Sequence, residues 1–243
     1  MVKHKVSVGM LFGLFLSLVT MVWGAGNNSF YLPVVAVPPT PTPLASDEVH
    51  VLPNHSYYRW RHGGIDQWVF VGEIRNDSDQ PVDRVEISAL IFDARGNFRA
   101  TAHGAVYPSY LLPDTTGCFL LTTTYQQAPE VGSYLFEGPH FRLAQGPLLS
   151  LNPVGVQGST PEPTTYRVLG GLHNTHDRSA LDAQYGISLY DEDGTIVDCG
   201  GSGVDGFDVA PGAVQPFDDR FDRRDHYLDV MDHEVRATGY AGR

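Results

Sequence analysis

The sequence predicts an all-β protein with two tandem immunoglobulin-like antiparallel β-sandwiches, which follow a signal peptide and a Pro/Thr-rich linker. The composition is the first reason: 26 of the 243 residues are Gly, 17 are Pro and only 18% are charged, a balance that favours short strands and turns over long helices. The second reason is an internal repeat, and the third is the alternation of apolar and polar residues inside each copy.

Residues 1–24 are expected to form a signal peptide. Lys3 and Lys5 supply a basic start, an apolar run covers residues 6–22, and Gly24 offers a small residue for cleavage. We therefore expect a secreted or cell-surface, extracytoplasmic protein, with no membrane insertion once the signal is removed. An uncleaved N-terminal anchor is the alternative, because a run of about 17 residues reaches the lower limit for a bilayer span.

Residues 25–46 are expected to form a Pro/Thr-rich linker. Its prolines at positions 38, 39, 41 and 43 fix φ and remove amide donors. Such a segment favours an extended polyproline II spacer, which acts as a plain linker or as a stalk.

The charge of the chain excludes several partners. Both lysines lie in the signal peptide, so 14 of the 16 basic residues remain, all arginines, against 28 acidic residues. A protein this acidic is not expected to bind nucleic acid or an anionic membrane surface.

The repeat appears when the chain is shifted by 98 residues against itself. Most matching residues are of the turn type, and apolar positions match apolar positions between them. The identical pairs include Gly72/Gly170, Asn76/Asn174, Asp93/Asp191, Gly96/Gly194, Pro113/Pro211 and Phe119/Phe217. We therefore expect two copies of one small domain, at residues 47–145 and 146–243.

Each copy carries the two-residue period of a strand with one buried face. In the second copy five positions, including Leu181 and Leu189, keep the same phase as in the first. The residues expected to point inward are Val82, Val85, Ile87, Ala89 and Ile91 in the first copy, and Leu181, Ala183, Tyr185, Ile187 and Leu189 in the second. Hairpin turns are expected at 93–96 and 191–194, where Gly supplies a positive φ.

The end of this strand resembles a known family. The stretch Ile187-Ser188-Leu189-Tyr190-Asp191, followed by Gly194, is similar to the FxLYD domain of bacterial extracytoplasmic proteins. The first copy carries Ala89-Leu90-Ile91-Phe92-Asp93 and departs from the pattern at its first aromatic position. The resemblance covers about half of each copy. It implies a small Ig-like β-sandwich on an exported bacterial protein, and it brings no catalytic residues.

No motif predicts catalysis or a cofactor. The sequence has no Gly-x-Ser-x-Gly elbow, no catalytic cysteine signature, no His-Glu-x-x-His and no phosphate loop. Asp191-Glu192-Asp193-Gly194 resembles the start of a calcium loop, but the first copy has Arg95 within the equivalent turn, so a solvated hairpin is expected. The histidines at 173, 176, 226 and 233 are expected in solvated loops rather than in a zinc site.

Two aromatic residues are candidates for ligand contact. Trp60 and Tyr58 lie near the turn at 61–64, where their rings would be able to stack on a sugar. Packing within the protein is the alternative. Glycosylation acceptor patterns begin at Asn27, Asn54 and Asn76, and the bacterial character of the architecture argues against their use.

Cys118 and Cys199 are the only two cysteines, and they lie in different copies at positions that are not repeat equivalents. Three states are open: a bridge between the two copies, two separately buried thiols, and a link to another molecule. A bridge would hold the two copies together, and its reduction would free their relative orientation while leaving both folds intact.

These observations favour a non-enzymatic secreted or cell-surface protein that acts as a structural or recognition module, whose partner is an envelope protein, an extracellular protein or a glycan. A carbohydrate-binding or adhesive module that uses exposed aromatic residues is the first alternative. An extracytoplasmic hydrolase without a recognised motif is the second.

Overall fold

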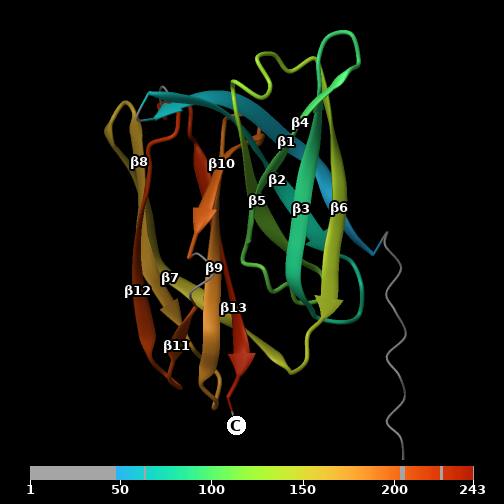
Figure 1. Cartoon of the computed structure of the whole chain (residues 1–243). Coiled ribbons are helices and arrows are strands. Elements are labelled where there is room, and N and C mark those ends of the chain that lie inside the picture. The colour runs from blue at the N-terminus through green and yellow to red at the C-terminus, as the bar shows by residue number, and fades with distance from the viewer. Residues whose placement is uncertain (1–47, 63, 203–205, 225–226, 243) are drawn as a thin grey trace, which may run out of the picture. The chain divides into compact units, whose positions relative to one another are not determined.

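The computed structural model describes residues 48–62, 64–202, 206–224 and 227–242, so the expected signal peptide and linker lie outside the described residues. The described part contains thirteen β-strands and no helix, and every ladder between strands is antiparallel (Figure 1). The prediction of an all-β antiparallel protein is confirmed.

The strands form two curled sheets, which together belong to one compact unit. The first sheet has the order β1-β2-β5-β4-β3-β6, and the second has the order β10-β9-β13-β7-β8-β12, with β11 paired to β9. The strands of the first sheet are β1 (Val49–His62), β2 (Ile65–Asn76), β3 (Val82–Phe92), β4 (Phe98–Tyr107), β5 (Thr115–Thr124) and β6 (Ser133–Leu143). Those of the second are β7 (Leu148–Glu162), β8 (Thr165–His173), β9 (Ala180–Tyr190), β10 (Ile196–Gly201), β11 (Phe207–Val209), β12 (Val214–Phe221) and β13 (Asp232–Ala241).

The internal repeat is visible in the turns. The Asp93 carboxylate accepts the backbone N–H groups of Arg95 and Asn97, and the Asp191 carboxylate accepts those of Asp193 and Thr195 in the same way. The expected hairpin turns at 93–96 and 191–194 are confirmed, with φ of 79° and 74° at their glycines.

The loops before these strands repeat as well. The side chains of Asn76 and Asn174 are fully buried. Each donates to one backbone carbonyl in its own loop, that of Gln80 or Arg178, and to one that lies 35 residues further on, that of Leu111 or Val209. Each also accepts the N–H of the second residue after it. An Asn is needed at both positions because only a short carboxamide both donates to and accepts from the backbone there.

Apart from β11, each sheet consists of two groups of three strands, and the two copies join these groups along different edges. In the first copy β1-β2-β5 joins β4-β3-β6 through the β5–β4 ladder, whereas in the second β12-β8-β7 joins β13-β9-β10 through the β7–β13 ladder. The first copy therefore leaves the edges of β1 and β6 unpaired, and the second leaves those of β10 and β12. The free edge of β10 faces the first copy.

Each copy has its own apolar core. One buried cluster draws all its members from the first sheet and its loops, and the other draws all of its members from the second. In each, a glycine lies beneath a phenylalanine of the paired strand: Gly72 pairs with Phe119, and Gly170 pairs with Phe217. A Cβ at Gly72 would lie 2.4 Å from the Phe119 ring, which explains why the repeat retains a glycine there.

One expected inward position is wrong. Leu181 is 38% exposed, although Ala183, Tyr185 and the following alternate residues are buried as expected. The reason is a local irregularity in the backbone at Asp182, where φ is 49°. It shifts by one residue the alternation of inward-facing and outward-facing side chains along β9. The same irregularity occurs at Arg84, with φ of 51°, so both copies carry it at equivalent positions.

Candidate functional site

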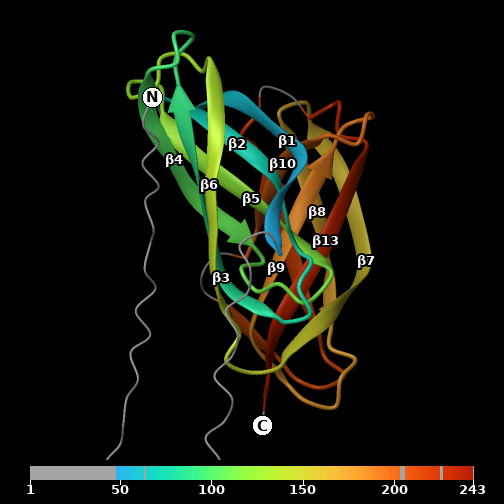
Figure 2. The ribbon, with the colours of Figure 1, turned by 90° about the vertical axis from the view of Figure 1, so that its right-hand side faces the viewer.

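The two copies meet along a surface that we call the junction, where β10 of the second copy lies beside β1, β2 and β5 of the first (Figures 1 and 2). A third buried apolar cluster fills it, made of Val69, Val71, Cys118, Ile196 and Cys199. Strand β2 is buried on both faces in consequence: Phe70 and Ile74 point into the core of the first copy, while Val69 and Val71 point into the junction. This explains the continuous apolar run in β2, since a strand covered on both sides has no polar face.

A disulfide crosses the junction and joins Cys118 of β5 to Cys199 of β10, with 6.0 Å between their Cα atoms. Both residues are buried, and Cys118 Sγ lies 3.4 Å from the carbonyl oxygen of Ile187. The structure thus shows the bridge between copies, the first of the three states that the sequence left open. Disulfides are typical of proteins in oxidising compartments.

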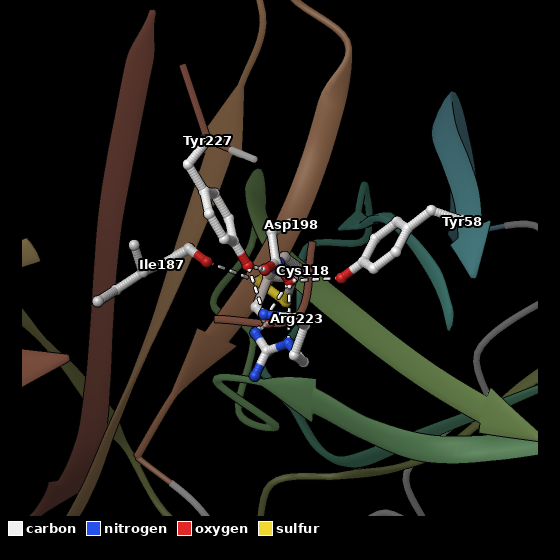
Figure 3. A network of polar contacts seen from close by, with 7 residues as sticks. Tyr58, Cys118, Ile187, Asp198, Arg223 and Tyr227 are labelled. Carbon is white, nitrogen blue, oxygen red and sulfur yellow. Dashed lines mark hydrogen bonds and ion pairs between the residues drawn. A yellow bond between two sulfur atoms is a disulfide. The ribbon is translucent and has the colours of Figure 1, made fainter. Parts of the chain in front are cut away.

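A fully buried carboxylate, Asp198, stands beside this disulfide (Figure 3). It accepts hydrogen bonds from the hydroxyl of Tyr58 at 3.1 Å, from that of Tyr227 at 2.6 Å and from the guanidinium of Arg223 at 2.9 Å. Arg223 also donates to the carbonyl of Cys199 at 2.6 Å. Figure 3 shows Tyr58 and Tyr227 approaching Asp198 from opposite sides, so one carboxylate connects both copies.

The electrostatics of this network keep its tyrosines protonated. Burial raises the pKa of Tyr58 and of Tyr227, and the nearby negative charge of Asp198 raises both further. Burial acts to lower the pKa of Arg223, but the attraction of Asp198 outweighs it, so the net shift is upward. Each copy therefore offers Asp198 a tyrosine hydroxyl that stays neutral at physiological pH.

Strand β1 contributes alternate side chains to the junction. The Asn54 carboxamide oxygen accepts the N–H of Ile196 at 2.9 Å, and the Ser56 hydroxyl donates to the carbonyl of Ile196 at 2.6 Å. Tyr58, the next residue on that face, reaches Asp198 as described. The contacts of Asn54 and Ser56 occupy the N–H and the carbonyl of Ile196 on the edge strand β10. These backbone groups would otherwise be free to pair with another chain.

A second polar cluster lies at Glu73, a buried residue of β2. Its carboxylate accepts from the Tyr190 hydroxyl at 2.8 Å and from Asn54 Nδ2 at 2.9 Å, and Arg236 Nη1 lies 3.5 Å away. Burial raises the pKa of Tyr190 to about 12, and the Glu73 charge adds to the shift. Tyr190 is the aromatic residue of the FxLYD-like stretch, so this position serves the junction rather than the core of its own copy.

Close backbone approach defines the far side of the junction. Gly186 of β9 lies so near Tyr107 that a Cβ on it would stand 2.0 Å from the Tyr107 carbonyl oxygen. Beyond this point, the Gln184 carboxamide oxygen accepts both the N–H and the hydroxyl of Ser109, at 3.1 and 2.9 Å. The hydroxyl of Tyr110 donates to the carboxylate of Asp182. Polar contacts between the copies thus extend along the whole of β9.

No protein-family model matches the chain, and no curated protein matches it. The resemblance to FxLYD domains therefore stays a prediction.

The two candidate aromatic residues lie at the junction. Tyr58 points to Asp198, and Trp60 is half-buried against the junction cluster. The exposed aromatic residue of β1 is instead Tyr57, which is 43% exposed and packs on Phe70 and Trp68. The alternation along β1 explains the difference, since Tyr57 and Tyr58 must point to opposite faces and the second copy covers the face of Tyr58.

The acidic and histidine clusters remain separate in the part of the chain that the structure describes. No group of three or more His, Cys, Asp or Glu side chains converges there. Asp191 is engaged with its own turn, His176 Nε2 lies 3.0 Å from the carbonyl of Ser150, and His233 Nδ1 lies 3.3 Å from the Tyr166 hydroxyl. His226 lies outside the described residues.

Two of the three glycosylation acceptor patterns have their Asn side chains engaged in the fold. Asn54 Nδ2 donates to Glu73, and Asn76 Nδ2 donates to the carbonyl of Gln80. A folded chain does not offer these nitrogens to a glycosyl donor. Asn27 lies outside the described residues. None of the described residues belongs to a helix that could span a membrane.

Proposed function

We propose that the protein is a non-enzymatic, exported bacterial protein whose two β-sandwich repeats act as one rigid structural or recognition module at the cell surface or outside the cell. The observation that carries this proposal is the junction, where a disulfide and the buried Asp198 network join repeats that each have their own core. Repeats joined by a bare linker are free to reorient, whereas a covalent and buried contact holds a fixed surface towards a partner.

The experiment is to locate the full-length chain in the organism that encodes it and to count its thiols in the same sample. Intact cells are labelled with an antibody, and the protein from the medium or envelope fraction is alkylated without reductant. We expect surface-accessible or released protein with no alkylated cysteine. Protein confined to the cytoplasm with two alkylated cysteines would overturn the proposal.

A panel of glycosidase, esterase and peptidase substrates tests the hydrolase alternative. We expect no turnover, and no change in the melting temperature when EDTA is added, because ligands that bind only the native state would otherwise stabilise it. Turnover that EDTA abolishes would support the hydrolase.

The carbohydrate-binding alternative depends on Tyr57. Its exposed ring packs with Trp68, Phe70 and Tyr134, and the nearby Arg59 lies 4.3 Å from the centre of the Tyr125 ring, so the first copy presents an aromatic surface near its open edge. A glycan array compares the wild type with Tyr57→Ala, and with Phe98→Ala as the control, since Phe98 is also exposed but lies in β4. Glycan binding lost only in Tyr57→Ala would favour this function, and the absence of any glycan binding would exclude it.

A further inference from the structure

The two outer strands of the first sheet, β1 and β6, face each other along a line that we call the seam. No ladder joins them in the described part of the chain. In the second copy the strands at the equivalent positions, β7 and β13, pair directly with each other. Leu151 and Ala237 form a hydrogen-bonded pair of that ladder, because the N–H of Ala241 bonds to the carbonyl of Pro147 in the same register.

Two prolines explain why the seam has no ladder there. Pro53 and Pro139 take the places of Leu151 and Ala237 when the chain is shifted by 98 residues against itself. Neither proline has an N–H, so the two backbone hydrogen bonds of this pair cannot form in the first copy.

Side chains join β1 to β6 where the backbone does not. The hydroxyl of Tyr134 lies 2.8 Å from His55 Nδ1. The centre of the His55 ring lies 5.6 Å from that of Tyr134 and 5.2 Å from that of Phe136, and both rings belong to β6. On β2, Gly72 stands opposite His55, and a Cβ there would lie 2.9 Å from His55 Cβ. The histidine is therefore enclosed by the edge of β6 and by a glycine that leaves room for it.

The surroundings of His55 hold no opposite charge. Gly72 faces it from β2, and Tyr134 and Phe136 face it from β6. Tyr57, the next residue on the same face of β1, packs on Tyr134 with 5.5 Å between ring centres. The titratable groups among these neighbours are two phenols, and no described carboxylate or guanidinium forms an ion pair with His55. Burial lowers the pKa of the His55 imidazole below its ordinary value of 6.5, and a hydrogen bond to its own backbone offsets part of this shift.

Strand β1 connects the seam to the junction. His55 and Tyr57 contact Tyr134 across the seam. The alternate residues Asn54, Ser56 and Tyr58 bond to β10 of the second copy. A change of charge at His55 therefore acts on the strand that also contacts the second copy.

We propose that His55 and Tyr134 form a pH-sensitive latch, which holds β1 against β6 while His55 is neutral and releases the seam when His55 takes up a proton. The neutral imidazole accepts the Tyr134 hydroxyl at Nδ1, whereas the imidazolium places a positive charge among aromatic rings without a counter-ion. The second copy has Pro153 and Asp232 at the equivalent positions, so the latch belongs to the first copy alone.

The sign of the pH dependence follows from the lowered pKa of His55. A histidine of this kind stabilises the folded state fully above its unfolded pKa of 6.5, and this contribution is lost as the pH falls through the folded-state value. The latch goes beyond the structural or recognition role proposed above, and that role does not depend on it.

The first test is an NMR titration of the imidazole signals from about pH 8 to about pH 5, on the oxidised full-length chain. The signal of His55 is identified by its loss in His55→Phe. We expect His55 to titrate with a pKa below 6.5. A pKa at or above 6.5 would overturn the proposal.

Amide hydrogen exchange then measures whether the seam opens. After correction for the intrinsic pH dependence of exchange, protection in β1 and β6 should fall about threefold or more between about pH 7 and about pH 5, while protection in β9 and β13 stays nearly constant. His55→Phe keeps an aromatic ring without a titrating group and should abolish this pH dependence. His103→Phe, at an exposed position of β4, is the control and should retain it.

Tyr134→Phe provides a second variant, so the test does not depend on the folding of His55→Phe. It keeps the ring and removes only the hydroxyl, and it should lower the protection of β1 and β6 already at about pH 7. The latch is overturned if protection in these strands does not change with pH, if the change persists in His55→Phe, or if Tyr134→Phe is protected as well as the wild type.

Discussion

The hydroxyl of Tyr58 in the first repeat donates a hydrogen bond to the carboxylate of Asp198 in the second, 140 residues further along the chain. The second repeat supplies Tyr227 and the counter-ion Arg223 to the same carboxylate, and the first repeat adds a neutral hydrogen-bond donor. The junction therefore depends on both repeats for one buried anion, and disturbing that anion should weaken the whole unit.

Asp198→Asn should destabilise the protein by about 3 kcal/mol or more, because it leaves the Arg223 guanidinium largely buried without its counter-ion. Urea denaturation followed by circular dichroism measures the loss. Asp218→Asn is the control: Asp218 pairs with Arg167 on the surface, where an ion pair contributes no more than about 1 kcal/mol. Equal effects of the two substitutions would contradict the role given to Asp198.

Replacing both cysteines, as Cys118→Ala with Cys199→Ala, should lower the free energy of unfolding by about 4 kcal/mol in the chain-entropy account, because the bridge joins residues 81 positions apart. Both apolar cores lie elsewhere, so the amide NMR spectrum of the variant should retain the dispersion of a folded protein. A loss below about 1 kcal/mol would show that the bridge adds little to the junction, and a collapsed spectrum would show that the repeats cannot fold without it.

Gly186→Ala should destabilise the junction by about 1–3 kcal/mol, since the new Cβ would stand 2.0 Å from the backbone of Tyr107, which cannot rotate away as a side chain can. Gly171→Ala is the matched control in the same repeat. Its Cβ would meet Val214 Cγ1 at 2.5 Å, but Val214 is exposed and free to change rotamer. The melting temperature should therefore fall clearly in Gly186→Ala and only slightly in Gly171→Ala.

The Asp93 carboxylate should make the free energy of unfolding depend on pH. Hydrogen bonds from the N–H and the side chain of Asn97, with further support from Arg95 and Arg99, hold the pKa of Asp93 well below its usual value. A carboxyl group with a lowered folded-state pKa stabilises the protein above its unfolded pKa of about 3.9, and this contribution is lost as the pH falls through the folded value.

Asp93→Asn should therefore have a lower melting temperature than the wild type at pH 7, and the difference should shrink as the pH falls below about 4. Asp193→Asn is the control, because the Asp193 carboxylate accepts no hydrogen bond from a described residue. A difference between wild type and Asp93→Asn that stays constant from pH 7 to about pH 2 would contradict this account.

The alternation of apolar residues and the Asp-x-x-Gly turns predicted β3, β9 and the hairpin turns after them because these signals are local. The irregularity at Asp182 was not predictable, since it depends on the backbone pairing of β9 with its neighbours and not on residue type, and it moved Leu181 to the surface. Asp83 shows the same limit: it sits in a polar phase of the sequence, yet it is buried beside Arg142, 59 residues away.

The junction was predictable only in outline. Two cysteines in different repeats suggested a bridge, but the polar residues around it carry no local signal, because Asp198 and Arg223 lie 25 residues apart and become partners only once the second repeat has folded. Asn54, Ser56 and Tyr58 do share one face of a strand, and this spacing of polar residues on an edge strand is the one sequence feature that would have pointed to a covered surface. Tyr58 was instead considered as a sugar contact.

Residual dipolar couplings of the backbone amides test most directly whether the two repeats form one rigid unit. They are measured on the oxidised full-length chain and fitted separately for β1–β6 and for β7–β13. The structure predicts that one alignment tensor, with a common magnitude and orientation, fits both sets. Two tensors that differ in magnitude would mean that the repeats move independently despite the disulfide, and would contradict the proposal of a rigid module.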